Sequence, residues 1–217
     1  MPVSTHSTSN LVREIIESDG VVRNGLARKL INERALARYI QMSTHQEHSF
    51  EAILGAIRRY PIREPGAAYQ RVGKFIQKLA MKNKIVRVSV LNEPDIPLVL
   101  ARFSEKVDYG RGDTFHLTTG IDTVDVLIDS KNLPKLLSVL PKKSVREVVD
   151  NLVEIVILMS DDANLTRGII AAISSQLAMN DINVQDYLHC APYDIIVFEE
   201  KDALKAYKAI EDLSKRR

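Results

Sequence analysis

The hydrophobic periodicity of the chain changes at Lys84, and this change limits the folds that the sequence can adopt. Before Lys84, apolar residues recur three and four positions apart, as they do in amphipathic helices. After it, stretches such as KIVRVSV alternate between apolar and polar residues, as half-buried strands do. We therefore expect an α+β protein, in which a helical N-terminal domain, residues 1–83, precedes a region of mixed strands and helices.

The pattern predicts about five helices in residues 1–83. Gly20 is expected to end the first, LVREIIESDG, and VVRNGLARKL is expected to form the second. Asn32 is a suitable N-cap for a third helix, ERALARYIQM, and Ser49 for a fourth, FEAILGAIRRY, because both side chains accept hydrogen bonds from a first helical turn. The last helix, GAAYQRVGKFIQKLAMK, is expected to lead out of the domain at residues 66–82.

After Lys84 the elements are expected in the order strand, helix, strand, strand, helix, strand, which is that of a ferredoxin-like βαββαβ unit. The same order begins again near Leu152, so the repeat is about 65 to 70 residues long. We therefore predict two tandem modules, residues 84–150 and 151–217.

The second module stops after its second helix and leaves no residues for a fourth strand. Three arrangements remain open: a short sheet edge, a strand at 145–149 that both modules share, or pairing with a second chain. Because an unpaired edge tends to recruit another strand, the pattern favours a homodimer.

Composition narrows the class of protein further. The longest apolar run, LVEIVILM, contains Glu154 and is far shorter than the ~18 residues that span a bilayer. The N-terminus, MPVSTHSTSN, lacks the basic and apolar segments of a targeting signal. The single cysteine, Cys190, excludes an intramolecular disulfide framework and a cysteine-rich zinc site. We expect a cytoplasmic protein that does not enter the membrane.

Sequence motifs for catalysis are missing. There is no Gly-rich phosphate loop, nucleophile elbow or His-Glu-x-x-His helix. His45 and His48 are three residues apart in a polar loop, and this spacing alone is weak evidence for a metal site. We expect neither an enzyme nor a resident metal or cofactor.

The second module carries a recognisable pattern between Gly168 and Ile210. A glycine opens its first helix, ISSQLA runs along that helix, INV begins the next strand, and DALKAYKAI follows an acidic turn. This stretch resembles an ACT domain, the amino-acid-sensing module of aspartokinases and of other regulators of amino-acid metabolism. With INERALARYI and EAILGAIRRY upstream, the whole chain resembles archaeal proteins described as predicted regulators of amino-acid metabolism. The resemblance implies tandem ACT modules, an amino-acid ligand and no kinase activity.

The loop SDDANLTRG is the candidate ligand site. It joins a strand to a helix, and the free N–H groups and dipole of a helix N-terminus favour an anion such as an amino-acid carboxylate. Asp161 or Asp162 is suited to bind the ammonium group, and Asn183 to add an amide. The alternative is that Asn164 or Thr166 simply caps the helix. The expected ligand contacts are Asp161, Asp162, Asn164, Thr166, Arg167, Gly168, Asn183 and Val184.

The strand that follows this helix has two expected faces. Alternation from Ile182 places Val184, Asp186 and Leu188 with the core, and Gln185, Tyr187 and His189 on the open face, where Tyr187 is expected to contact a partner rather than the ligand. Asn180 and Asp181 are expected only to turn the chain, because Asn and Asp tolerate the left-handed conformation.

The helical domain has two candidate partners. Residues 1–83 hold 13 Lys/Arg and 7 Asp/Glu, whereas the remainder is acidic. GLARKLINERALARYI is a candidate helix-turn-helix, with Ala35, Leu36, Tyr39 and Ile40 directed inward. Its outward residues Arg34, Arg38 and Gln41 are the candidate DNA contacts. The alternative is a regulatory subunit whose helical domain docks on a biosynthetic enzyme.

Overall fold

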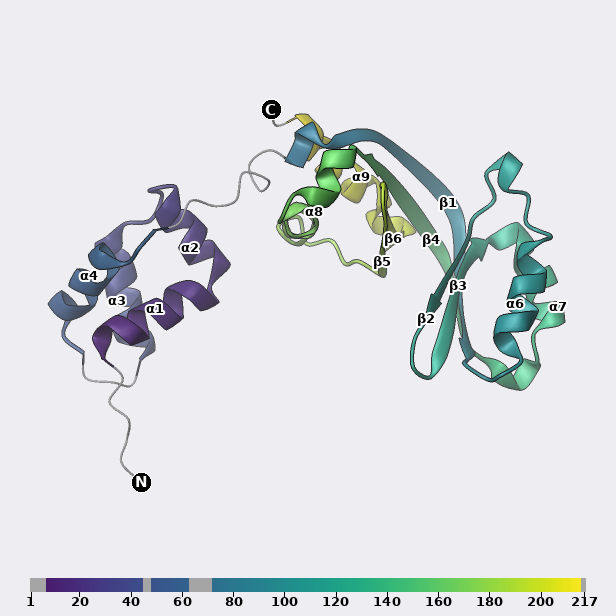
Figure 1. The fold of residues 1–217 in the computed structure, drawn as a ribbon, viewed down its shortest axis with the longest axis horizontal. Coiled ribbons are helices and arrows are strands. Elements are labelled where there is room, and N and C mark those ends of the chain that lie inside the picture. The colour runs from purple at the N-terminus through teal and green to yellow at the C-terminus, as the bar shows by residue number, and fades with distance from the viewer. Residues whose placement is uncertain (1–6, 45–47, 63–71, 216–217) are drawn as a thin grey trace, which may run out of the picture. The chain divides into compact units, whose positions relative to one another are not determined.

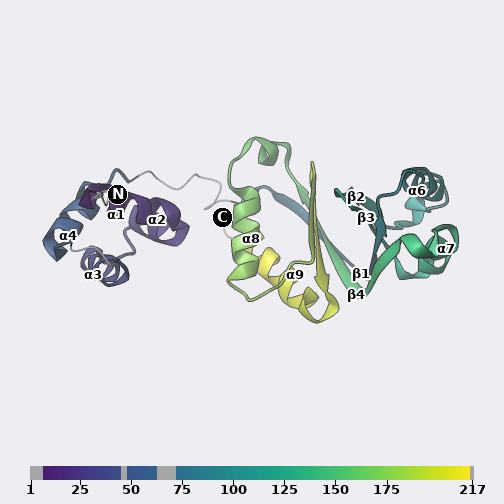
Figure 2. The same ribbon diagram turned by 90° about the horizontal axis from the view of Figure 1, so that it is seen from below.

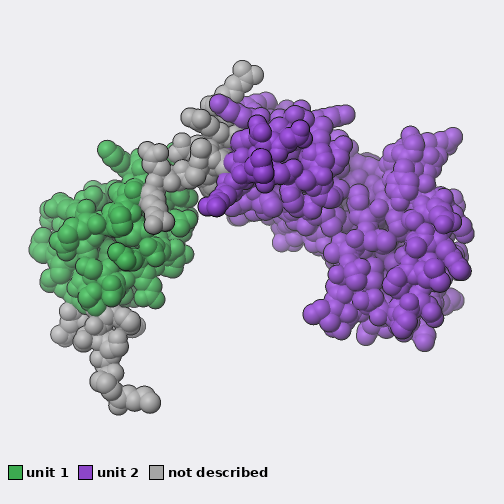
Figure 3. All heavy atoms as spheres, viewed as in Figure 1, with its two compact units in different colours: residues 1–67 green, residues 68–217 purple. Residues whose placement is uncertain are grey.

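The computed structural model describes residues 7–44, 48–62 and 72–215. The chain forms two compact units, Met1–Ala67 and Ala68–Arg217 (Figure 3). The first unit is helical, and the second contains all the strands of the described chain.

Unit 1 contains the helices α1 (Thr8–Ser18), α2 (Gly20–Ala27), α3 (Glu33–Ser43) and α4 (Phe50–Arg59). The predicted caps are confirmed, since Asn32 accepts from two backbone N–H groups of α3 and Ser49 from one of α4. Gly20 does not end the first helix. Asp19 caps α2 at its Val21 and Val22 amides, so Gly20 becomes the first residue of α2.

The buried face of α3 differs in part from the prediction. Leu36 and Ile40 are buried as expected, together with Ala37. Ala35 and Tyr39 are exposed, and Tyr39 retains 60% of its accessible surface. The apolar stripe that α3 presents to the core of unit 1 is therefore rotated by one residue, because Ala37 rather than Tyr39 lies beside Leu36 and Ile40.

Unit 2 is built on one six-stranded antiparallel sheet in the order β2-β3-β1-β4-β6-β5. The strands are β1 (Ile76–Leu91), β2 (Phe115–Thr119), β3 (Thr123–Asp129), β4 (Val145–Met159), β5 (Asp186–Cys190) and β6 (Tyr193–Glu199). The α-helices are α6 (Ile96–Ser104), α7 (Leu133–Val139), α8 (Ile169–Ala178) and α9 (Glu200–Lys215). Figures 1 and 2 show α6 and α7 on one side of this unit and α8 and α9 on the other, with the strands between them.

The helix predicted over residues 66–82 is wrong for the part that the structure describes. Val72–Lys74 is a short 3-10 helix, and Ile76 begins β1. Gln, Lys, Leu, Ala and Met favour helices, but such propensities are weak and tertiary pairing overrides them. Here the pairing partner is the apolar second half of β4. The first compact unit consequently ends at Ala67 rather than at residue 83.

The same pairing supplies the strand that the second module lacks. Ile76–Lys82 pairs with the second half of β4, whose other neighbour is β6. The first half of β4 pairs with the second half of β1. Both long strands are therefore shared between the modules, which corresponds to the shared-strand alternative. A second chain is not needed to complete the sheet, and its outer strands in the described chain are β2 and β5.

Each module has its own apolar core. Val86, Val88 and Val90 face α6 and α7, whereas Ile155, Ile157 and Phe198 face α8 and α9. Between these cores, residues of opposite orientation form a smaller cluster of Ile85, Leu127, Leu152 and Val197. Because neighbours along a strand point to opposite faces, this cluster joins the faces of the two modules that carry no helices.

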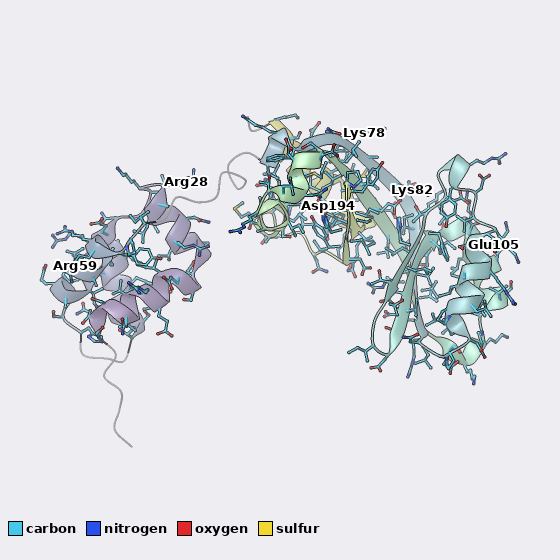
Figure 4. All side chains as sticks on the ribbon, viewed as in Figure 1. Arg28, Arg59, Lys78, Lys82, Glu105 and Asp194 are labelled. Atoms are coloured by element: carbon cyan, nitrogen blue, oxygen red, sulfur yellow. The ribbon has the colours of Figure 1, made fainter. Side chains whose placement is uncertain are left out.

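A buried polar network lies where the modules meet. Lys82 Nζ lies 2.8 Å from Asp129 Oδ1 and donates to Thr114 Oγ1 at 2.9 Å. The Thr114 hydroxyl in turn donates to Glu154 Oε1 at 2.6 Å. Glu154 is only 4% exposed, and its other carboxylate oxygen lies 3.4 Å from His116 Nε2. Figure 4 labels Lys82 on the long strand β1. The network thus ties β2, β3 and the two shared strands together.

We predict that Thr114→Val destabilises the protein by about 1–3 kcal/mol, because the buried Glu154 carboxylate loses a hydrogen bond that nothing replaces. Chemical denaturation of the full chain measures the change. Thr118→Val on the exposed part of β2 is the matched control and should be neutral or slightly stabilising. Equal effects of both substitutions would mean that the network does not contribute to stability.

Candidate functional site

Helix α8 begins without a side-chain cap. Its N-cap is Gly168, which has φ +91° and offers no side-chain acceptor. The Thr166 hydroxyl donates to the Asp162 carbonyl oxygen at 2.7 Å instead. The alternative in which Asn164 or Thr166 caps this helix is therefore wrong. At any helix start the first backbone N–H groups have no acceptor within the helix. At the start of α8 no capping side chain supplies that acceptor.

A cavity of about 250 Å³ opens in front of this helix start. One wall consists of Gly168–Ala171 at the beginning of α8. A second wall comes from the preceding loop, where Ala163, Asn164 and Thr166 line it. Met159, at the end of β4, contributes an apolar surface.

The hairpin formed by β5 and β6 contributes the ionisable groups of the cavity. His189 and Asp194 both line it, and they are directly opposite each other in the strand register. His189 Nδ1 lies 2.7 Å from Asp194 Oδ1. The Asp194 side chain is 1% exposed and the His189 side chain 46%. Figure 4 labels Asp194 beside α8. The cavity thus combines free N–H donors with a buried carboxylate.

Tyr187 lies close to Asp194 but does not line the cavity. Its hydroxyl is buried, and burial is the main reason that its pKa is raised above the ordinary value. The negative charge of Asp194 raises the pKa of Tyr187 further. Tyr187 therefore stays protonated and neutral, so the hydroxyl adds no charge to that of the Asp194–His189 pair.

The predicted faces of the strand around Tyr187 are reversed. Tyr187 packs against the core beneath α8 and α9, whereas Leu188 contacts the cluster on the opposite face. The alternation counted from Ile182 fails because β5 begins only at Asp186, and the residues before it are not in a strand. Asp181 has φ +49°, which confirms that this position turns the chain.

The predicted ligand residues divide into two groups. Asn164, Thr166 and Gly168 line the cavity. The other predicted contacts do not line it. The exposed ones among them are Asp161, Asp162, Arg167 and Asn183, and Val184 packs against the core instead.

Sequence analysis missed His189 and Asp194. The detectable signal was the Ala191–Pro192 turn, because pairing the strands across it places residues 189 and 194 directly opposite each other.

The candidate DNA contacts lie together on α3. Arg34, Arg38 and Gln41 are exposed. The Arg34 guanidinium lies 5.5 Å from the centroid of the Phe50 ring. Gln41 Nε2 donates to the His48 carbonyl oxygen at 3.2 Å, so part of its capacity is used within the unit.

The positive charges of unit 1 concentrate around α2 and α3. Between Arg23 and Arg38 the chain has five basic residues and one acidic residue, Glu33, which pairs with Arg58 at 3.3 Å. Figure 4 labels Arg28 after α2 and Arg59 at the end of α4. Exposed Tyr39 and Met42 lie on the same helix as Arg34 and Arg38.

Within residues 7–44, 48–62 and 72–215, no group of three or more His, Cys, Asp or Glu residues is arranged to hold a metal ion. The same residues include no helix with the length and hydrophobicity required to cross a membrane.

We predict that Gly168→Ala destabilises the protein by about 1–2 kcal/mol, because an L-residue with a Cβ is strained at φ +91°. Gly168→Asn should cost less, since asparagine tolerates the left-handed region better than alanine does. Urea denaturation of both variants tests this order. An alanine variant as stable as the wild type would mean that the helix start adopts another conformation.

No family model matches the sequence, and neither does any curated protein. Several solved structures share its fold. The Clostridium acetobutylicum aspartate kinase matches with a TM-score of 0.52 and 19% identity over 64% of this chain, which spans 35% of the kinase. The ligand-free regulatory subunit of aspartate kinase from Thermus thermophilus gives 0.52 and 10%, with 64% and 97% of the two chains covered. The Thermus flavus regulatory subunit gives 0.53 and 10%, with 64% and 98% covered. The likeness is one of fold, and that fold is the ACT-type fold of aspartate kinase regulatory domains.

Proposed function

We propose that the chain is an amino-acid-responsive regulator of amino-acid metabolism, like the archaeal proteins that it resembles in sequence. The amino acid binds in the cavity at the start of α8, and the helical unit 1 carries the output. The chain itself catalyses no reaction. Binding alters the output only if affinity differs between two arrangements of the protein, so the regulator must have at least two such states.

The uncapped start of α8 carries this proposal. Its free N–H groups and its dipole are suited to an α-carboxylate. On the hairpin side of the same cavity, the buried Asp194 carboxylate is suited to an α-ammonium group. The cavity volume of about 250 Å³ is below that of typical drug-sized sites and suits a single amino acid.

The fold comparison supports the same class of function. The chain spans 97% and 98% of the two Thermus regulatory subunits. Both are described as regulatory subunits of aspartate kinase, and the sequence of this chain has no phosphate-binding loop. A sensor is therefore proposed rather than an enzyme.

We predict that Ala171→Met abolishes the stabilisation that an amino acid gives to the wild type. Ala171 is exposed and lines the cavity, so a methionine at this position fills the cavity without disturbing the core. At ~100 times its dissociation constant the ligand should stabilise the wild type by about 2.7 kcal/mol. Thermal denaturation with each of the common amino acids measures this shift.

Ser174→Met is the matched control, because Ser174 is exposed on α8 and does not line the cavity. It should keep the full thermal shift, and so should Asn183→Ala. If no amino acid stabilises the wild type, or if Ala171→Met responds fully, the proposed site is wrong.

DNA is the proposed partner of unit 1. Helix α3 exposes two arginines beside Tyr39 and Met42, and the preceding turn is also basic. A helix with basic and bulky exposed side chains after a short turn suits a major groove. The alternative is a regulatory subunit that docks on a biosynthetic enzyme, and the exposed Tyr39 and Met42 favour that alternative too.

We predict that Arg34→Ala combined with Arg38→Ala weakens DNA binding at least about tenfold and lowers the dependence of log affinity on log salt. The loss of the Arg34–Phe50 contact should cost only about 0.5–1 kcal/mol of stability. Fluorescence anisotropy at several salt concentrations, with Arg13→Ala on α1 as the control, gives both quantities. Binding that does not respond to salt would favour the enzyme partner.

A cytoplasmic homodimer completes the proposal. The outer edges of β2 and β5 are the strand edges that the described part of unit 2 leaves for a second copy. The unpaired, exposed Cys190 is compatible with a reducing compartment.

A further inference from the structure

The cavity in front of α8 contains two complementary polar ends and an aliphatic remainder. One end is the set of free N–H groups at Ile169–Ala171, and the other is the Asp194 carboxylate with His189. Between them the lining includes Met159 and Ala163. This further step rests on the proposed function, and it concerns which amino acid the cavity accepts.

Asp194 is a buried carboxylate that lies in contact with one imidazole. A carboxylate with 1% exposure is costly unless it is paired or hydrogen-bonded. His189 supplies the contact at 2.7 Å, and as an imidazolium it also supplies the compensating positive charge. A ligand ammonium group would provide the same charge and the same kind of donor.

The two ends of the cavity match the two charges of an amino-acid backbone, and the lining residues that the structure describes include no further charged side chain. Asp161, Asp162 and Arg167 are exposed on the loop outside the lining. A charged ligand side chain would therefore lose its hydration without gaining a partner, which is unfavourable.

We propose that the cavity selects an α-amino acid with an uncharged aliphatic side chain, whose ammonium group binds Asp194 in place of the positive charge of His189. The α-carboxylate lies at the start of α8, and the side chain contacts the aliphatic lining. His189 releases its proton to solvent as the ammonium group arrives.

This exchange makes binding depend on pH in a defined direction. Histidine is the side chain that ordinarily changes its charge between about pH 5 and 8. Protonated His189 occupies Asp194 and repels an ammonium group, so the affinity should increase from pH 6 to pH 8. Release of one proton per ligand corresponds to an increase of up to about tenfold for each unit of pH.

The other groups described near His189 do not account for this pH dependence of binding. From the hairpin, Tyr187 stays protonated because its pKa is raised by burial, and Asp194 is the group that the ammonium binds. The loop contributes Asn164 and Thr166 to the lining, which have no charge. The lining residues of α8 and Met159 of β4 are also uncharged.

Isothermal titration calorimetry of the full chain tests the proposal. Valine, leucine and isoleucine should bind, whereas lysine, arginine, aspartate and glutamate should bind at least tenfold more weakly. Titrations at pH 6, 7 and 8 in two buffers of different ionisation enthalpy give the affinity and the number of protons released.

His189→Asn removes the titrating group and retains a hydrogen-bond donor for Asp194. In this variant the affinity for the aliphatic amino acids should no longer vary between pH 6 and 8, and proton release should disappear. His116→Asn is the matched control on β2, outside the cavity lining, and it should keep both the pH dependence and the proton release.

The outcomes separate this proposal from the proposed function. Binding of lysine or glutamate in preference to valine, leucine and isoleucine would overturn the proposed ligand class but leave an amino-acid sensor. Aliphatic binding without proton release, or with the opposite pH trend, would overturn the exchange at Asp194. If none of the common amino acids binds at any of the three pH values, the amino-acid sensor itself is wrong.

Discussion

The antiparallel pairing of β1 with β4 is the interaction on which the rest of unit 2 depends. The two strands stay paired from Ile76↔Met159 to Val90↔Val145, with register shifts along the way. Each strand therefore serves first one module and then the other. Lys84 in β1 and Asn151 in β4 both have positive φ. They lie near the register shifts of the β1–β4 pairing, at the boundary between the two modules. Because neither module has a complete sheet without the other, they are expected to fold together.

This sharing also connects the candidate site to the first module. Arg87 in the first-module half of β1 donates to Asp186 Oδ2 at 3.1 Å, at the start of β5. His189, which lines the cavity, lies three residues after Asp186 in β5. The only strand that pairs with β5 in the described sheet is β6, so the Arg87 contact gives this strand a second attachment. A ligand that moved β5 would have to change this contact as well.

The sequence was sufficient where local pattern and tertiary environment agree. Asn32 and Ser49 cap helices as expected, and the strands and helices from Ile85 onward occur in the predicted order. It was insufficient for residues 76–82, because Gln77, Lys78 and Ala80 favour a helix in isolation. Only the partner strand, which lies more than 70 residues later in the chain, makes this segment extended. Short-range periodicity contains no information about such a partner.

The candidate site shows the same limit at the scale of a single residue. His189 and Asp194 meet because the turn at Ala191–Pro192 places them opposite each other on the face covered by α8 and α9. Alternation has a period of two, so an error of one residue in the starting point assigns every side chain of β5 to the wrong face. The chemistry of the cavity is thus set by the hairpin register as much as by the residues near Gly168. A motif centred on the helix start identifies the proposed position of a ligand carboxylate, but Asp194, the group proposed to bind the ammonium, follows only from the strand pairing.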